Sequence, residues 1–143
     1  MDVGKRSISD WLLRKKEGEN MATSIPADST QPVQDGIRPD NGRDFDLYEL
    51  YRYTNGGPIE LLSLPDGRLM VCNEEAKLSG LSENQRASAL IGFRSAGEAR
   101  AILAAYAARG EAVIVVGELP EDDNAPADYI AGDVLVCAAH EIS

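Results

Sequence analysis

The clearest hydrophobic pattern in the chain spans residues 93–117 and predicts one helix followed by one buried strand. Ser95 and Glu98 stand at capping-box spacing, which marks a helix start. The next apolar positions recur three or four residues apart and form a single helical face: Ala99, Ile102, Leu103, Tyr106 and Ala107. Gly110 predicts the helix end, and the unbroken apolar run Ala112–Val116 predicts a strand covered on both faces. We interpret this helix and strand as the core scaffold.

Shorter patterns on either side predict the rest of a sheet. Leu47–Tyr53 is rich in aromatic residues and predicts a strand, with a helical turn as the alternative. Ile59–Leu64 and Arg68–Cys72 flank a Pro-Asp-Gly turn, which predicts a hairpin. The apolar run Val134–Ala139 predicts a further strand, and we expect it to lie next to Val113–Val116.

Two short helices are predicted between the hairpin and the main helix. Asn73 is placed to cap one over Glu74–Leu78, and Ser82 with Gln85 forms a second capping box for a helix that ends near Ile91. Strands are thus grouped first and helices next, an order that favours the α+β class. We expect a mainly antiparallel sheet of about five strands, with two or three helices packed on one face.

Composition divides the chain near residue 45. Residues 21–44 are rich in Ser, Pro, Asp, Asn and Gly and have no periodic apolar pattern, so their burial cannot offset the entropy of ordering them. We expect residues 1–44 to form a disordered N-terminal tail. Residues 45–143 are expected to form a single compact α+β domain, because their number is ordinary for one domain.

Two hypotheses concern the first 20 residues. Residues 16–19, Lys-Glu-Gly-Glu, would be encoded by a purine-rich stretch at ribosome-binding-site spacing before Met21, if the host is bacterial. Translation would then start at Met21, and residues 1–20 would be a translated leader. The alternative is that Trp11–Leu13, followed by Lys15–Lys16, is a short docking motif.

Charge and cysteine content indicate the compartment and the class of partner. The chain has 143 residues and a net charge of −10, which disfavours nucleic acid and anionic membranes and favours a basic protein partner. No apolar run is as long as a membrane span, and no signal-peptide pattern opens the chain. Cys72 and Cys137 each lie in an apolar run, so we predict reduced core thiols and a cytoplasmic protein.

Motifs of catalysis and cofactor binding are missing from the sequence. His140 is the single histidine, and neither paired zinc-ligand spacing nor a Gly-x-Ser-x-Gly elbow occurs. No glycine-rich phosphate loop is present. Tyr48, Tyr51 and Tyr53 around Arg52 resemble a base-stacking platform, but the acidic charge favours packing in the core and on the sheet as their role. We therefore expect no enzymatic activity, no cofactor and no bound metal.

The densest charge in the chain follows the predicted core strand and gives the candidate partner-binding site. Its residues are Glu118, Glu121, Asp122, Asp123 and Asp128. As a calcium loop the segment fails, because Pro126 and Ala127 occupy positions that need a ligand and a glycine. The leading hypothesis is a small acidic binding or inhibitor protein of the immunity-protein or nucleic-acid-mimic type. The alternatives are a homo-oligomeric structural module, or a small enzyme or ligand-binding domain whose site arises only in the fold.

Overall fold

The computed structural model describes residues 22–111 and 118–142. The chain divides into two compact units: the sheet unit, which ends at Ile91 and resumes at Ile130, and the helical unit, Gly92–Tyr129. Residues 45–143, which we predicted to form one compact domain, are divided between these two units. The hypotheses about the first 20 residues, and the strand predicted at Ala112–Val116, lie outside the described residues.

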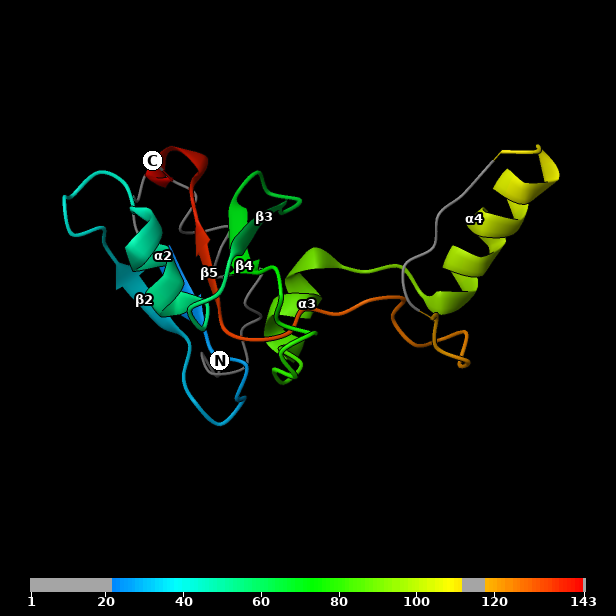
Figure 1. The fold of residues 1–143 in the computed structure, drawn as a ribbon, viewed down its shortest axis with the longest axis horizontal. Helices are drawn as coiled ribbons and strands as arrows, with labels where there is room; N and C mark the ends of the chain where they lie inside the picture. The colour runs from blue at the N-terminus through cyan, green and yellow to red at the C-terminus, as the bar shows by residue number, and fades with distance from the viewer. Residues whose placement is uncertain (1–21, 112–117, 143) are drawn as a thin grey trace, which may run out of the picture. The chain divides into compact units, whose positions relative to one another are not determined.

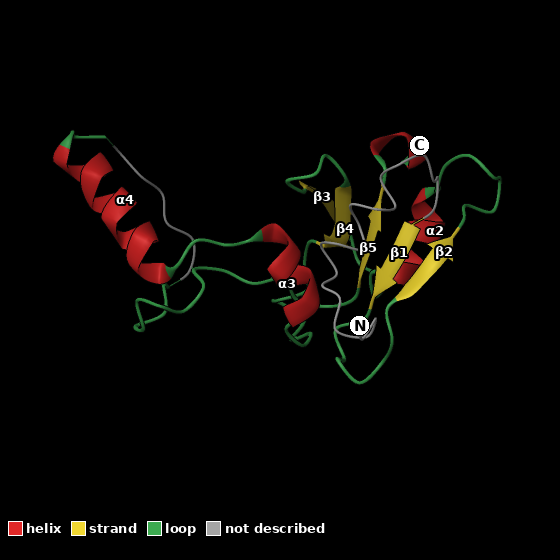
Figure 2. Cartoon of the chain, turned by 180° about the vertical axis from the view of Figure 1, so that it is seen from behind, coloured by secondary structure: helices red, strands yellow, loops and turns green. Residues whose placement is uncertain are grey.

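A five-stranded antiparallel sheet dominates the sheet unit, with the strand order β2-β1-β5-β4-β3 (Figure 1, Figure 2). The strands are β1 (Ala22–Ile25), β2 (Gln34–Ile37), β3 (Ile59–Ser63), β4 (Leu69–Asn73) and β5 (Val134–Cys137). The helices are α2 (Leu47–Tyr53), α3 (Gln85–Ile91) and α4 (Ala96–Ala108), with a short 3-10 helix, η2 (Ala139–Glu141). This confirms the predicted α+β class and its antiparallel sheet.

The centre of the sheet is β5, whose four side chains are all buried. Its sequence Val-Leu-Val-Cys has no polar position, as expected of a strand covered on both faces. The strand predicted at Val134–Ala139 is confirmed, although it ends at Cys137. β3 and β4 form the predicted hairpin around Pro65–Gly67, with Leu61 opposite Val71.

The predicted tail is wrong for residues 22–37, which contain two strands of the sheet. β1 lies between β2 and β5, as Figure 2 shows, and its register places Thr23 opposite Val136. Both Thr23 and Ile25 are fully buried. Composition failed as a guide because β1 pairs with a strand near the other end of the chain, which the local sequence does not reveal.

Leu47–Tyr53 forms the helix α2, so the predicted strand is wrong and the helical alternative is observed. The Asp46 carboxylate accepts a hydrogen bond from the Glu49 N–H at 2.8 Å, and the Glu49 carboxylate accepts one from the Asp46 N–H at 3.1 Å. This Asp-x-x-Glu capping box is a helix-start signal. The helix covers a core cluster of six buried residues: Ala22, Phe45, Leu50, Val71, Leu135 and Cys137.

A buried asparagine, rather than the predicted Ser82–Gln85 capping box, starts α3. The Asn84 Oδ1 atom accepts a hydrogen bond from a backbone N–H in the first turn of the helix, at 3.0 Å. Its Nδ2 atom donates to the carbonyl oxygens of Ile25 and Gly132, each at 2.9 Å. α3 is thereby tied to the end of β1 and to the segment that leads into β5. The helix predicted over Glu74–Leu78 is wrong, because these residues form turns.

The helical unit consists of α4 and the segment that follows it, and the predicted main helix is confirmed. Ser95 is the N-cap, and its Oγ atom accepts a hydrogen bond from the Glu98 N–H at 3.2 Å. Within α4 only Ala96 is buried. The helix is therefore not the core scaffold that its pattern predicted, and the buried residues of the sheet take that role.

Candidate functional site

The acidic residues predicted to face a partner all lie in the helical unit and are exposed. They are Glu118, Glu121, Asp122, Asp123 and Asp128. We call the segment 118–128 the acidic loop. The side chain of Asp123 forms an ion pair with Arg100, whereas among the described residues no ion pair is seen at Glu118 or Glu121.

The acidic loop is held against the first turn of α4. The Ala96 N–H donates to the Ala125 carbonyl at 2.7 Å, and the Gly97 N–H donates to the Asp123 carbonyl at 3.0 Å. A Cβ atom on Gly97 would lie 3.0 Å from the Asp123 Cβ, so the loop packs tightly against this glycine. Arg100 adds a hydrogen bond to the loop backbone. The position suits the charge, because carboxylates are stabilised near the positive end of a helix dipole.

Some carboxylates of the acidic loop stabilise the loop itself. Asp122 accepts a hydrogen bond from the Asn124 N–H at 2.9 Å, and Asp128 accepts one from the Tyr129 N–H at 2.8 Å. Across residues 22–111 and 118–142, no group of three or more metal-ligating side chains is arranged to hold an ion. The loop therefore presents negative charge on a short, locally hydrogen-bonded backbone.

The two cysteines are free and buried, so the prediction of reduced core thiols is confirmed. Burial is the main cause that raises the pKa of Cys72 to about 12, and Glu60 contributes. Burial likewise raises the pKa of Cys137 to about 12, with a smaller effect of Glu141. Thiols with such pKa values are protonated at neutral pH and are poor nucleophiles. His140 lies in η2 and is exposed.

The tyrosines near Arg52 lie on α2 and do not form the cross-strand pairs that a strand would have given. Tyr53 packs edge-on against Phe45, with ring centroids 6.4 Å apart. Tyr48 is 79 % exposed and meets Tyr51 edge-on. Arg52 pairs with an aspartate at 3.1 Å, so its charge is locally compensated.

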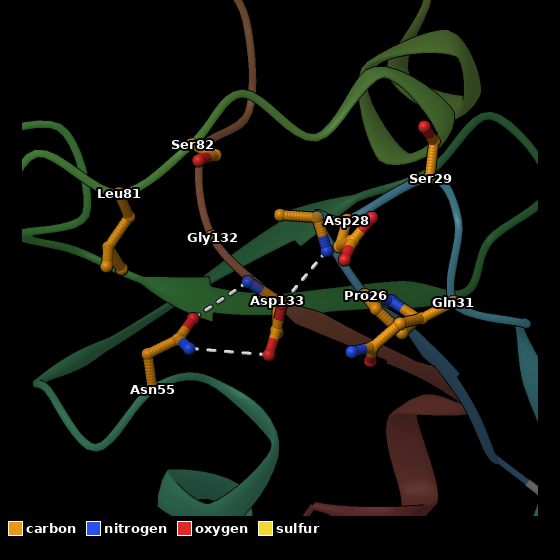
Figure 3. A pocket seen from close by; sticks show the side chains of 10 residues that line it. Pro26, Asp28, Ser29, Gln31, Asn55, Leu81, Ser82, Gly132 and Asp133 are labelled. Atoms are coloured by element: carbon orange, nitrogen blue, oxygen red, sulfur yellow. Dashed lines mark hydrogen bonds between the residues drawn. The ribbon is translucent and has the colours of Figure 1, made fainter.

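A hollow of about 590 Å³ opens in the sheet unit, and no sequence pattern indicates it (Figure 3). Four segments meet around it: the loop after β1, the turn after α2, the residues before α3, and the residues before β5. Its polar lining comes from Asp28, Ser29, Gln31, Asn55, Ser82 and Asp133. Among the described residues that line it, there is no lysine, arginine or histidine.

Asp133 joins two of these segments at the base of the hollow. Its carboxylate accepts hydrogen bonds from the Ala27 N–H at 2.9 Å and from the Asn55 Nδ2 atom at 3.3 Å (Figure 3). The Asn55 Oδ1 atom in turn accepts from the Asp133 N–H at 2.8 Å. Asn55 has a positive φ of 62°, which asparagine tolerates better than most residues. Gly132 also has a positive φ and passes so close to Asn55 that a Cβ atom would collide with its side chain.

The loop after β1 is held from its other side by Arg86 of α3. The guanidinium group donates to the carbonyl oxygens of Pro26, Asp28 and Gln31 at 2.8, 3.1 and 2.9 Å. Because three carbonyls of one short loop share one cation, the loop is pinned in a defined shape. Local sequence could not predict this arrangement, since Arg86 lies more than fifty positions from the residues it binds.

Comparison of the chain with protein-family models, with curated proteins and with solved structures finds no match. None of the helices in the described part of the chain is both long and apolar enough to cross a membrane.

Proposed function

We propose that this chain is a small, acidic, non-enzymatic binding protein that occupies a basic surface of a partner protein. The mode of action would be that of an immunity protein or a nucleic-acid mimic, which blocks its partner sterically. The observation that carries the proposal is the exposure of all five carboxylates of the acidic loop on an anchored backbone.

Electrostatics would bring the two proteins together. A net charge of −10 creates a long-range field that accelerates encounter with a basic partner, and salt screens this field within about 10 Å at 0.1 M. Complementary charge contributes more to the association rate and to specificity than to final affinity. The free thiols suit a reducing compartment, which supports a cytoplasmic location.

The test is affinity capture from a native lysate at low and at high salt, with a loop variant and a matched control. The loop variant carries Glu118→Gln, Glu121→Gln and Asp122→Asn, the last of which keeps an oxygen to accept the Asn124 N–H. The control replaces three other exposed glutamates, Glu74, Glu75 and Glu83, with glutamine. Both variants lose three negative charges, so a difference between them reports the loop rather than the net charge.

The proposal expects a basic partner that the wild type and the control retain at low salt and that the loop variant retains poorly. A partner bound equally by both triple variants, or a partner indifferent to salt, would contradict the role of the acidic loop. Recovery of no basic protein would count against the proposal as a whole.

A second candidate function is self-association through α4. Its exposed flank is made of small residues, Ala101, Ala104, Ala105 and Ala108, which would permit close approach of a second helix. Light scattering over a range of protein concentrations tests it, and a monomer at the highest concentration would rule it out.

A further inference from the structure

The hollow in the sheet unit has the electrostatic character of a site for a cation. Two aspartates line it, Asp28 and Asp133, and the remaining polar groups offer amide and hydroxyl oxygens as further acceptors. The Arg86 guanidinium, whose charge helps, after the hydrogen bonds of Thr30, to lower the pKa of Asp28, donates from its two Nη atoms to three loop carbonyls. The lining therefore presents negative charge to anything that enters.

Within the described part of the chain, the hydrogen bonds to the Asp28 carboxylate all go to one oxygen. Both the Thr30 Oγ1–H and the Thr30 N–H donate to the same atom, Oδ1, at 2.7 and 2.9 Å. These hydrogen bonds, that from the side chain first, hold the pKa of Asp28 below its ordinary value, so the group is ionised at neutral pH. Neither bond uses Oδ2. Asp133 also lines the hollow, and its carboxylate accepts a hydrogen bond from the Ala27 N–H of the same loop, drawn as a dashed line in Figure 3.

The site is built before any ligand arrives. Arg86 fixes the loop after β1 from one side, and Asp133 fixes it from the other through the Ala27 N–H. Asn55 and Asp133 hold each other by two reciprocal hydrogen bonds. Such pre-organisation lowers the entropy lost on binding, because the acceptors are already in position when a ligand enters.

We propose that the hollow binds one guanidinium or ammonium group, presented by an arginine or lysine side chain of a basic partner protein. A planar guanidinium has five N–H donors, which suit a lining of carboxylate, amide and hydroxyl acceptors. An anion would meet two carboxylates with no basic side chain among the described lining residues. That the cation belongs to a partner protein rests on the proposed function. That the hollow prefers a cation rests only on the residues that line it.

The experiment is an NMR titration of the full-length ¹⁵N-labelled chain with blocked arginine amide, a probe that carries the guanidinium and no terminal charge. Blocked citrulline amide is the matched neutral probe, because it replaces one guanidinium N–H₂ with oxygen and keeps the shape. At about 10 mM, above the roughly millimolar dissociation constant expected of so small a ligand, the arginine probe should shift the amide signals of Ala27, Ser82 and Asp133. Citrulline amide should shift them far less.

Two variants locate the interaction. Asp28→Asn keeps an oxygen to accept the Thr30 N–H but removes the charge in the hollow. Asp122→Asn is the matched control, since Asp122 makes the same kind of bond to the backbone N–H two residues later, but in the acidic loop. Asp28→Asn should weaken binding roughly twofold to fivefold, the range of one exposed ion pair, and Asp122→Asn should leave it unchanged.

Equal shifts with both probes would overturn the proposal, and so would shifts confined to residues outside the hollow. An affinity that survives Asp28→Asn unchanged would overturn the role of Asp28 and, with it, the site as proposed. These outcomes are separate from those of the capture experiment, which changes residues of the acidic loop and of the exposed glutamates only. A failed capture with a positive titration would leave a cation site without a protein partner.

Discussion

Asn84 ties three backbone segments of the sheet unit together, and replacing it with alanine tests how much these contacts stabilise the fold. Its side chain is fully buried. The Oδ1 atom accepts from the Ala87 N–H at 3.0 Å, and the Nδ2 atom donates to the Ile25 and Gly132 carbonyls at 2.9 Å each. Alanine removes all three hydrogen bonds and supplies no substitute.

The expected loss follows from those contacts. Removing an asparagine N-cap costs about 1 kcal/mol. Each buried carbonyl that loses a hydrogen-bond partner costs about 1 kcal/mol at the lower end of the usual range. The sum is about 3 kcal/mol, a large share of the roughly 5–15 kcal/mol that stabilise an ordinary domain.

Urea unfolding followed by far-UV circular dichroism measures this loss, and two further substitutions separate its parts. Asn84→Ser keeps an oxygen for the Ala87 N–H and should recover about 1 kcal/mol relative to alanine. Asn84→Asp also keeps the cap, but it turns a carboxylate towards two carbonyl oxygens in a buried site. It should be at least as destabilising as alanine.

The expected order of stability is therefore wild type, then serine, then alanine, with aspartate equal to alanine or below it. A loss under about 1 kcal/mol for Asn84→Ala would refute the arrangement, because a lost cap alone accounts for that much. An aspartate variant as stable as the wild type would show that the Nδ2 hydrogen bonds contribute nothing.

Three further predictions test the hollow and the core. Gly132→Ala should lower the free energy of unfolding by about 2 kcal/mol, because φ is +80° and the new Cβ would lie 2.9 Å from a side-chain oxygen. The control Gly67→Ala, also at positive φ but in open space, should cost about 1 kcal/mol. Equal shifts of the melting temperature in the two variants would contradict the steric argument. Arg86→Met keeps the aliphatic stem but removes the donors to three loop carbonyls. Amide hydrogen exchange in the loop after β1 should therefore become faster. Unchanged exchange would show that the Arg86 hydrogen bonds are not needed to order the loop. Burial raises the pKa of Cys72 and of Cys137 to about 12, against 9.0 for an exposed thiol. The contribution of these thiols to the unfolding free energy should therefore be constant below pH 9 and be lost as pH rises above it. A Cys72→Ala variant whose stability falls equally steeply above pH 9 would contradict this.

Helices and strands that are defined by a local sequence pattern were predictable. Ser95 caps α4 where the sequence places it, and the unbroken apolar run beginning at Val134 is the central strand β5. The hairpin around Pro65–Gly67 has its turn at the residues that favour one. In each case the residues that determine the element lie within it or directly beside it.

α2 shows where local pattern misleads. The aromatic content of Leu47–Tyr53 favours a strand, whereas the capping box of Asp46 and Glu49 favours a helix. The helix forms because Leu50 then packs against the sheet in the core cluster, while Glu49 satisfies two backbone N–H groups, those of Asp40 and Asp46. The capping-box signal for the helix begins at Asp46, one residue before the segment whose aromatic content predicts a strand.

The hollow could not be predicted, because its parts come from four separate places in the chain. Asn55, taken alone, indicates a turn, and Asp133, taken alone, continues a run of acidic residues. The structure places Asp133 in the sheet unit, where it bonds to the Asn55 side chain. Its role depends on strand order, which local sequence does not specify.

The segment after Met21 was expected to be disordered because its own side chains are too few and too polar to bury much apolar surface. Residues elsewhere in the chain also order this segment. Asn84 and Arg86 supply hydrogen bonds from α3 to four carbonyls of the segment, those of Ile25, Pro26, Asp28 and Gln31. Thr30 bonds only to the Asp28 Oδ1 atom, and no hydrogen bond to Oδ2 is seen among the described residues. A polar segment ordered by polar groups from elsewhere can thus keep a carboxylate oxygen for a ligand, and that is why the hollow is the part of the sheet unit to test for binding.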